Sequence, residues 1–162
     1  MSRLINKQIL FIFILITAVV FFIDQTSKYF AVKFLFSHSE GINIIGNYLR
    51  LNLVYNPNLV WGLPIRNHLT YYFLPLIGIG VVVYLALKTH SRFDAIIWGL
   101  MLAGALGNFI DRIRLGYVVD FIDMGIGNAR WPTYNLADSA LVVGIILLIV
   151  RLFLLKNETS LS

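Results

Sequence analysis

Four long apolar stretches decide what this chain can fold into. They cover about residues 8–28, 69–87, 95–112 and 136–155, and a membrane-spanning helix needs roughly 20 mainly apolar residues. Charged residues make up 13% of the chain, whereas a soluble domain usually carries about 25%. The sequence therefore predicts an all-α membrane protein with four transmembrane helices. Its 162 residues fit a single domain, residues 1–162.

The first stretch has some features of a secretion signal. Arg3 and Lys7 precede an apolar run, as they do in signal peptides. No small-residue cleavage site follows, and the chain continues directly into Phe21-Phe22-Ile23-Asp24. We therefore expect a retained membrane helix, which can continue past Lys28.

Charge counting does not orient the predicted helices. Four spans place both chain ends on one side, with six cations there and seven on the other side, so the positive-inside rule gives no answer. The acids are less even, because only Asp94 and Glu158 fall on the terminal side and six lie on the far side. A membrane face rich in both positive and negative residues indicates a structured polar site.

The polar segment between the first two spans, about residues 37–67, has the pattern of a sheet. In it Leu49, Leu51 and Leu53 alternate with polar residues, so they share one face of a strand. We expect a small antiparallel β-sheet on the membrane surface. The segment from Asp111 to Asn135 is expected to be a loop.

Small residues recur along the third span. Gly99, Ala103 and Gly107 are spaced by four, which lets helices approach closely in a membrane. This stripe leads into the polar end of the same helix at Asp111. We favour a packing role for the glycines.

Ionisable residues near membrane depth are costly and are candidates for function. Asp24 and Lys28 are one helical turn apart in the order that favours an ion pair, and we favour an anchoring pair over a direct role. Arg112 and Asp111 are neighbours that point in different directions, so we expect Asp111 to pair elsewhere. Arg112 either reaches lipid headgroups or holds substrate carbonyls or a carboxylate, and the sequence leaves both possibilities open.

Three further acids are the sharpest candidates for chemistry. Asp120 and Asp123 follow the third span, and Asp138 lies in the first turn of the fourth. Two carboxylates that meet at an apolar interface share a proton and can hydrolyse a peptide by general acid/base catalysis. The alternatives are a helix-start acid for Asp138 and a solvated loop charge for Asp123, and for Asp123 we favour the loop charge.

Other chemistries have little support in the sequence. With no cysteine, thiol catalysis and thiolate metal sites are excluded. The histidines are dispersed and form no zinc motif, and there is neither a serine-nucleophile elbow nor a phosphate-binding loop. No basic run suggests binding of nucleic acid. We expect no metal and no organic cofactor.

Two non-enzymatic functions compete with hydrolysis. In a transporter or proton-conducting subunit the acids would form a relay, but a relay needs acids at several depths and none falls in the middle of a span. An assembly scaffold held by the small-residue face would form a stable oligomer and tolerate substitution of its aspartates.

The chain resembles the lipoprotein signal peptidase family (signal peptidase II), which are bacterial intramembrane aspartic peptidases. Five segments match the family's motifs in the correct order, and together they cover nearly the whole chain. They are Asp24-Gln25-Thr26-Ser27-Lys28, Asn56-Pro57-Asn58-Leu59-Val60-Trp61-Gly62, Gly104-Ala105-Leu106-Gly107-Asn108-Phe109-Ile110-Asp111-Arg112, Val118-Val119-Asp120-Phe121 and Tyr134-Asn135-Leu136-Ala137-Asp138-Ser139.

The resemblance implies a role for each matching residue. Asp120 and Asp138 would be the catalytic pair. Asn56, Asn108, Arg112 and Asn135 would bind substrate or line the site, and Asp24, Lys28 and Asp111 would support the structure.

The resemblance also implies substrates, partners and location. The substrates would be diacylglyceryl-modified prolipoproteins, cut before the lipidated cysteine, with globomycin-type peptides as inhibitors. The protein would be a monomer in the bacterial cytoplasmic membrane, with cytoplasmic termini and its site near the outer face. The chain departs from the family at Asn58, where glycine is usual, and at Val60, where alanine is usual. Asparagine tolerates a left-handed backbone, so the turn can be kept.

Overall fold

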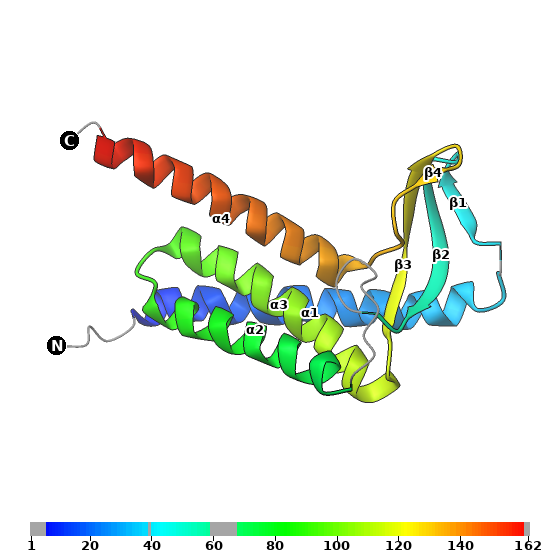
Figure 1. The fold of residues 1–162 in the computed structure, drawn as a ribbon, viewed down its shortest axis with the longest axis horizontal. Helices are drawn as coiled ribbons and strands as arrows, with labels where there is room; N and C mark the ends of the chain where they lie inside the picture. The colour runs from blue at the N-terminus through cyan, green and yellow to red at the C-terminus, as the bar shows by residue number, and fades with distance from the viewer. Residues whose placement is uncertain (1–5, 39, 59–67, 161–162) are drawn as a thin grey trace.

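A computed structural model gives the fold and describes residues 6–38, 40–58 and 68–160. It has four long helices and a small sheet (Figure 1). Along the chain the elements are α1 (Lys7–Leu35), β1 (Ile42–Ile45), β2 (Leu49–Asn56), α2 (His68–Lys88), α3 (Arg92–Leu115), β3 (Val118–Ile126), β4 (Ala129–Arg130) and α4 (Leu136–Ser160). All four helices are long and apolar enough to cross a membrane, which confirms the four predicted spans.

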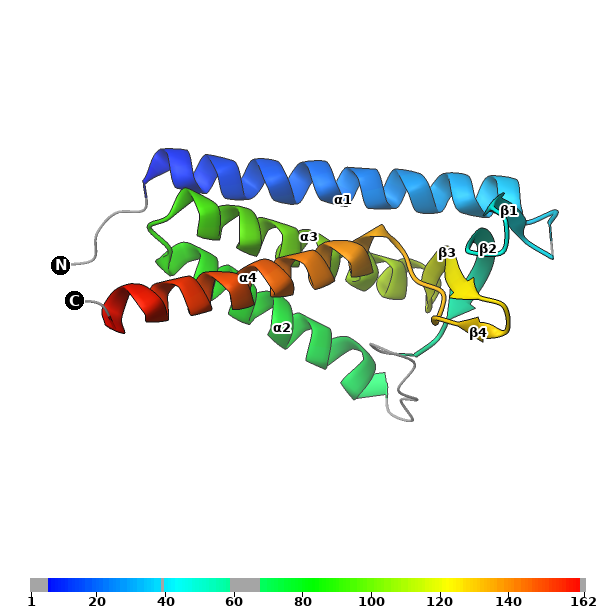
Figure 2. The same cartoon turned by 90° about the horizontal axis from the view of Figure 1, so that it is seen from above.

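Helix α3 is the central helix of the bundle and packs against the other three (Figure 2). The glycines on α3 allow this close contact, as the sequence predicts. A Cβ on Gly99 would lie 3.0 Å from Ile16 of α1, and one on Gly107 would lie 3.1 Å from the Cβ of Ala137 in α4. A Cβ on Gly104 would overlap the carbonyl oxygen of Ala137.

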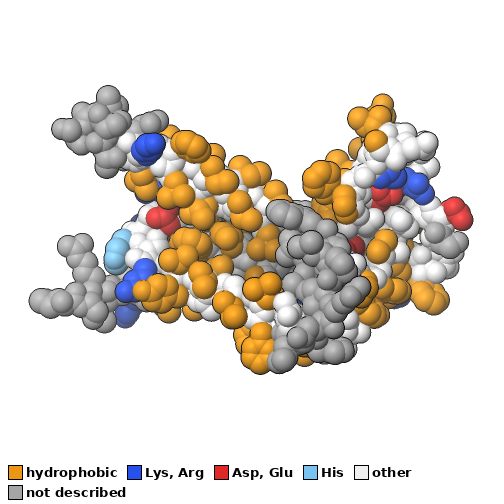
Figure 3. Space-filling view, viewed as in Figure 1, with side chains coloured by type: hydrophobic (Ala, Val, Ile, Leu, Met, Phe, Trp, Pro, Cys, Tyr) orange, Lys and Arg blue, Asp and Glu red, His pale blue; other side chains and the backbone are white. Residues whose placement is uncertain are grey.

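The outer surface of the bundle is apolar (Figure 3). Large side chains such as Phe22, Ile77 and Phe153 are more than half exposed. Water would penalise such a surface, whereas lipid tails solvate it. The helices are therefore solvated by lipid, and the polar residues gather at their ends.

Helix α1 is longer than the membrane core and supports the sheet. Its 29 residues span about 44 Å, whereas the hydrocarbon core is about 30 Å thick. The excess lies at the far end, where Ala31 and Leu35 are buried against Phe121 of β3, with Leu51 and Leu53 of β2 packed on them. Of the apolar face predicted for Leu49, Leu51 and Leu53, the last two thus pack on α1.

The sheet has four antiparallel strands in the order β1-β2-β3-β4, at the end of the bundle opposite the beginning of α1 and the end of α4 (Figure 1). The sheet itself was predicted, but the prediction of a loop over residues 111–135 was wrong, because β3 and β4 lie there. β3 is buried over residues 118–121, so it lacks the alternation of a half-buried strand. It also carries two aspartates, which are uncommon in strands.

Candidate active site

Asp120 and Asp138 belong to different kinds of element and are brought together by the segment that joins them. Asp120 is on β3, and Asp138 is in the first turn of α4. Tyr134, just before α4, pairs with Ile122 of β3 through backbone hydrogen bonds of 2.8 and 3.0 Å. The start of α4 is thereby fixed beside the strand that carries Asp120.

Asp120 is almost completely buried and is held by two amides. Its side chain accepts from Asn135 Nδ2 at 2.7 Å and from Asn56 Nδ2 at 2.8 Å, and the residue is 2% exposed. Burial raises the pKa of Asp120 to about 6, helped by the nearby Asp138 carboxylate and opposed by the two amides and by the charge of Lys28. This carboxyl therefore holds a proton at a higher pH than an exposed aspartate does.

Asp138 forms a reciprocal cap with Asn135 at the start of α4. Asp138 N donates to Asn135 Oδ1 at 2.9 Å, and Asn135 N donates to Asp138 Oδ2 at 3.2 Å, which is the arrangement of a capping box. The helix-start alternative for Asp138 is thus present in the structure. The second oxygen, Oδ1, accepts from Asn108 Nδ2 at 2.8 Å.

Asn108 links the two carboxylates. Its Oδ1 accepts from Asn135 Nδ2 at 3.0 Å, and that same Nδ2 donates to Asp120. Its Oδ1 also accepts from Lys28 Nζ at 3.1 Å. Since an ammonium group can only donate, Lys28 fixes which way the Asn108 amide points, with Nδ2 toward Asp138. The two amides and two carboxylates form one connected network.

Lys28 lies between two buried carboxylates. Its Nζ is 2.9 Å from Asp24 Oδ2 and 2.9 Å from Asp111 Oδ2, so the predicted Asp24–Lys28 pair forms and Asp111 joins it. Asp24 Oδ1 accepts from Ala137 N at 2.8 Å, and Asp111 Oδ2 accepts from Val119 N at 3.3 Å. Each acid thus holds the backbone amide directly before Asp138 or Asp120.

Arg112 lies near the site without contacting either of the two aspartates in a described hydrogen bond. It is 6% exposed, so the headgroup alternative is wrong. Its guanidinium lies 5.3 Å from the ring centre of Tyr71, and it donates to the carbonyl oxygens of Asn108 at 3.2 Å and Asn58 at 3.5 Å. Its buried Nε has no partner among the described residues.

Asn58 occupies a turn in which its backbone makes the contacts. Its N–H donates to Asn56 Oδ1 at 2.9 Å, and its carbonyl faces Arg112. Neither contact depends on the side chain that replaces the usual glycine. Val60 lies outside the described residues.

The interpretation of Asp123 as a solvated loop charge is wrong. Asp123 is 5% exposed and forms an ion pair with Arg130 Nε at 2.7 Å across the β3–β4 hairpin. It is three positions from Asp120 on one strand, and residues an odd number apart point to opposite faces. Strand geometry therefore separates Asp123 from the pair formed by Asp120 and Asp138.

Two residues of the site were not singled out from the sequence. Gln25 Nε2 donates to Asp111 Oδ1 at 3.1 Å and lies 3.2 Å from Asp24 Oδ2. Tyr71 stacks on Arg112, and its hydroxyl donates to a backbone carbonyl at the end of α3 at 3.1 Å. The signal for Gln25 was a polar residue beside Asp24 in an apolar helix, whereas a tyrosine near the start of α2 has no such signal.

The described residues contain no group of three or more acids, histidines or cysteines placed to hold a metal ion. What the arrangement offers is two neighbouring carboxylates, each oriented by amide donors. Such a pair can share a proton, and one member can accept a proton while the other donates.

Comparison with known proteins decides the family. The family model described as Signal peptidase (SPase) II matches residues 16–154. The chain belongs to the signal peptidase II family. The lipoprotein signal peptidase of Moorella thermoacetica is 39% identical over 150 residues, covering 90% of this chain and 95% of the relative. That of Borrelia turicatae is 38% identical over 170 residues, covering 98% of this chain and 96% of the relative.

Solved structures agree with the assignment to signal peptidase II. One, titled "Bacterial membrane enzyme structure by the in meso method at 2.3 A resolution", superposes with a TM-score of 0.80 at 33% identity, covering 93% of this chain and 91% of that one. The chain is thus a multi-pass membrane protein with lipoprotein signal peptidase function, and it hydrolyses peptide bonds.

Proposed function

We propose that this signal peptidase II is an aspartic endopeptidase whose catalytic residues are Asp120 and Asp138. The observation that carries the proposal is the amide network in which Asn108 and Asn135 join the two carboxylates. The raised pKa of Asp120, about 6, lets the pair hold a proton at a higher pH than two exposed aspartates would. The two protons that the pair can bind are coupled, so the shared proton belongs to both residues.

In the proposed reaction, the carboxyl groups of Asp120 and Asp138 share one proton, so one is ionised and the other is protonated. The ionised carboxylate removes a proton from a water molecule, whose oxygen bonds to the scissile carbonyl carbon. The protonated carboxyl donates a hydrogen bond to the carbonyl oxygen, which takes up the negative charge. Collapse of the tetrahedral intermediate breaks the C–N bond, and the nitrogen leaves with a proton from the pair. One water is consumed, and a carboxyl and an amine terminus are formed.

The proposed substrate is a prolipoprotein whose cysteine carries a diacylglyceryl group, cut on the N-terminal side of that cysteine. The relatives' name, lipoprotein signal peptidase, supports this substrate class. The position of the site also supports it, because Asp138 begins a lipid-exposed helix and Asp120 lies on the adjoining sheet. A lipid anchor in the membrane would bring the peptide bond to this level. The substrate would contact Asn56, Arg112 and the amide network.

The proposed location is the bacterial cytoplasmic membrane, with the chain ends in the cytoplasm and the sheet at the outer face. The cleavage site at the C-terminal end of a signal peptide is cut on the side to which the protein is exported, which supports a site on that side. We propose that the monomer is the active unit, because the polar groups of the site come from α1, β2, α3, β3 and α4 of one chain. Globomycin-type peptides would compete with substrate for this site.

The test is cleavage of a diacylglyceryl-modified precursor in detergent by the single variants Asp120→Asn and Asp138→Asn. Loss of one member of an acid/base pair is expected to lower kcat by about 100-fold or more. The matched control is Asp123→Asn on the opposite face of β3, which should retain kcat. If Asp120→Asn or Asp138→Asn cleaved the precursor at the wild-type rate, the substituted residue would not be catalytic.

A further inference from the structure

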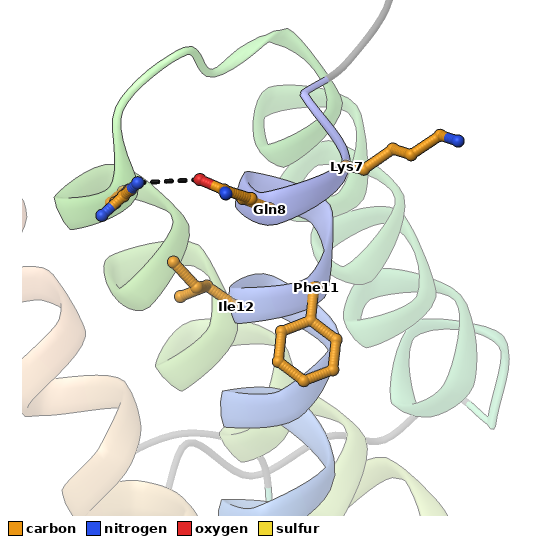
Figure 4. Close-up of a pocket in the computed structure, with 5 residues that line it drawn as sticks. Lys7, Gln8, Phe11 and Ile12 are labelled. Atoms are coloured by element: carbon orange, nitrogen blue, oxygen red, sulfur yellow. Dashed lines mark hydrogen bonds between the residues drawn. The ribbon is translucent and has the colours of Figure 1, made fainter.

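A groove lies at the end of the bundle opposite the sheet, where α1 and α3 begin. Its volume is about 560 Å³, and it is lined by Lys7, Gln8, Phe11, Ile12 and Arg92 (Figure 4). Lys7 and Arg92 are the first residues of their helices. The groove takes no part in the proposed reaction, because it is separated from the aspartates by the length of the bundle.

The charge around the groove is positive. Lys7 and Arg92 supply two cations, and no acid is among the lining residues. The first turn of α1 has no acid, and the one acid in the first turn of α3, Asp94, is paired with Arg151 at 3.2 Å. Both helices also direct their N-terminal N–H groups toward this end, and helix N-termini favour anions. These features select an anionic ligand.

The groove changes from polar to apolar along the axis of α1. Phe11 and Ile12 lie one helical turn deeper than Lys7 and Gln8, and Phe11 is 63% exposed. Figure 4 shows Phe11 and Ile12 below Gln8, with Lys7 extended away from the groove at the level of Gln8. A phospholipid has the same order, with phosphate at the surface and acyl chains beneath.

Arg92 has donors available for a phosphate. Its Nη2 donates to Gln8 Oε1 at 2.7 Å, which is its one side-chain hydrogen bond among the described residues. A guanidinium has five N–H donors in a planar fork that fits two phosphate oxygens. The Gln8 contact keeps the guanidinium over the groove, and most of its donors remain available.

We propose that this groove binds one anionic glycerophospholipid from the leaflet that faces the chain ends. Its phosphodiester would be bound by the Arg92 guanidinium beside Gln8, with the Lys7 ammonium adding positive charge at the same level, and one acyl chain would run along Phe11 and Ile12. Because the bound lipid contacts both α1 and α3, it stabilises their packing at this end.

The experiment measures lipid binding to the purified full chain by native mass spectrometry, with phosphatidylglycerol and phosphatidylcholine as separate probes. Wild type should bind one phosphatidylglycerol at least tenfold more tightly than phosphatidylcholine. The double variant Lys7→Gln/Arg92→Gln should lose at least tenfold of that affinity. The control Lys33→Gln/Lys88→Gln removes two exposed cations outside the groove and should change the affinity by less than twofold.

Three results would overturn the proposal. Equal losses in the two double variants would show that only the overall charge attracts the lipid. Equal binding of the two lipids by wild type would show that the phosphate is not selected over a neutral headgroup. A dimer that carries no lipid would show that a second copy covers this face. Since no peptidase assay is involved, the result is independent of the proposed mechanism.

Discussion

Lys28→Met removes a buried ammonium group from between two buried carboxylates. The oxygens of Asp24 and Asp111 both lie 2.9 Å from Nζ, so they are at most about 6 Å apart, and two charges at that distance repel by about 3 kcal/mol at an effective dielectric constant of about 20. Removing one partner of a buried ion pair costs about 3–5 kcal/mol. We expect a loss of about 3–5 kcal/mol in the free energy of unfolding.

Lys28→Met should also displace Asp120 and Asp138, through the backbone. Asp24 holds the amide of Ala137, and Asp111 holds the amide of Val119. If the two carboxylates move apart, the residues that follow these amides are displaced in opposite directions. A displacement of about 1 Å can lower a rate by about 100-fold. We therefore expect Lys28→Met to lower kcat by about 100-fold while KM changes little, because the apolar contacts of the substrate remain.

The assay combines cleavage of a lipidated precursor in detergent with unfolding followed by tryptophan fluorescence. Lys33→Met is the matched control, because Lys33 is on the same helix, is exposed and lies 5.9 Å from the ring centre of Phe34. It should leave both kcat and stability close to wild type. A Lys28→Met protein that is destabilised but cleaves at the wild-type rate would refute the argument that the ion cluster sets the separation of the aspartates.

Three further outcomes can be checked with the same measurements. The folded state binds the Asp120 proton more tightly, with a pKa of about 6 against 3.8; wild type should therefore lose about 2 kcal/mol of stability as pH rises from 4 to 6, a loss that Asp120→Asn should not show. Gly104→Ala overlaps the facing backbone of α4 and should cost about 1–3 kcal/mol, whereas Gly80→Ala, with open space around it, should be neutral or stabilising. Asp123→Asn breaks the ion pair with Arg130, so it should lower the melting temperature and leave kcat unchanged.

The helices were predictable because membrane solvation acts on each segment separately. About 20 apolar residues must form a helix in lipid whatever their neighbours are. The end of α1 was less predictable, because its last turns leave the lipid and are stabilised by Phe121 and Leu51 of the sheet. β3 was missed for the same reason. It is stabilised by pairing with β2 across more than 60 residues of chain, and its own residues lack the alternation of a half-buried strand and include two aspartates.

The candidate site was predictable only where partners are close in sequence. The Asp24–Lys28 pair follows from helix periodicity, and the pairing of Asn135 with Asp138 follows from capping. The third member of the ion cluster, Asp111, comes from another helix, and nothing in local sequence joins it to Lys28. The burial of Asp123 could not be predicted from the sequence either, because it depends on the hairpin that brings Arg130 over it.

The division of the aspartates between a strand and a helix explains why the ion cluster is needed. Asp120 is on a strand of the sheet, and Asp138 is on a membrane helix. Any movement of the sheet relative to the helix bundle would therefore change the distance between the two residues. The three buried charges of Asp24, Lys28 and Asp111 are not the most stable way to hold β3 against α4. Apolar residues of similar size often give equal or greater stability. Apolar contacts, however, are not directional, whereas the carboxylates on either side of Lys28 each accept a hydrogen bond from one particular backbone amide. The cluster therefore lowers stability in exchange for a fixed distance between the two carboxylates, and the proposed acid/base catalysis depends on that distance.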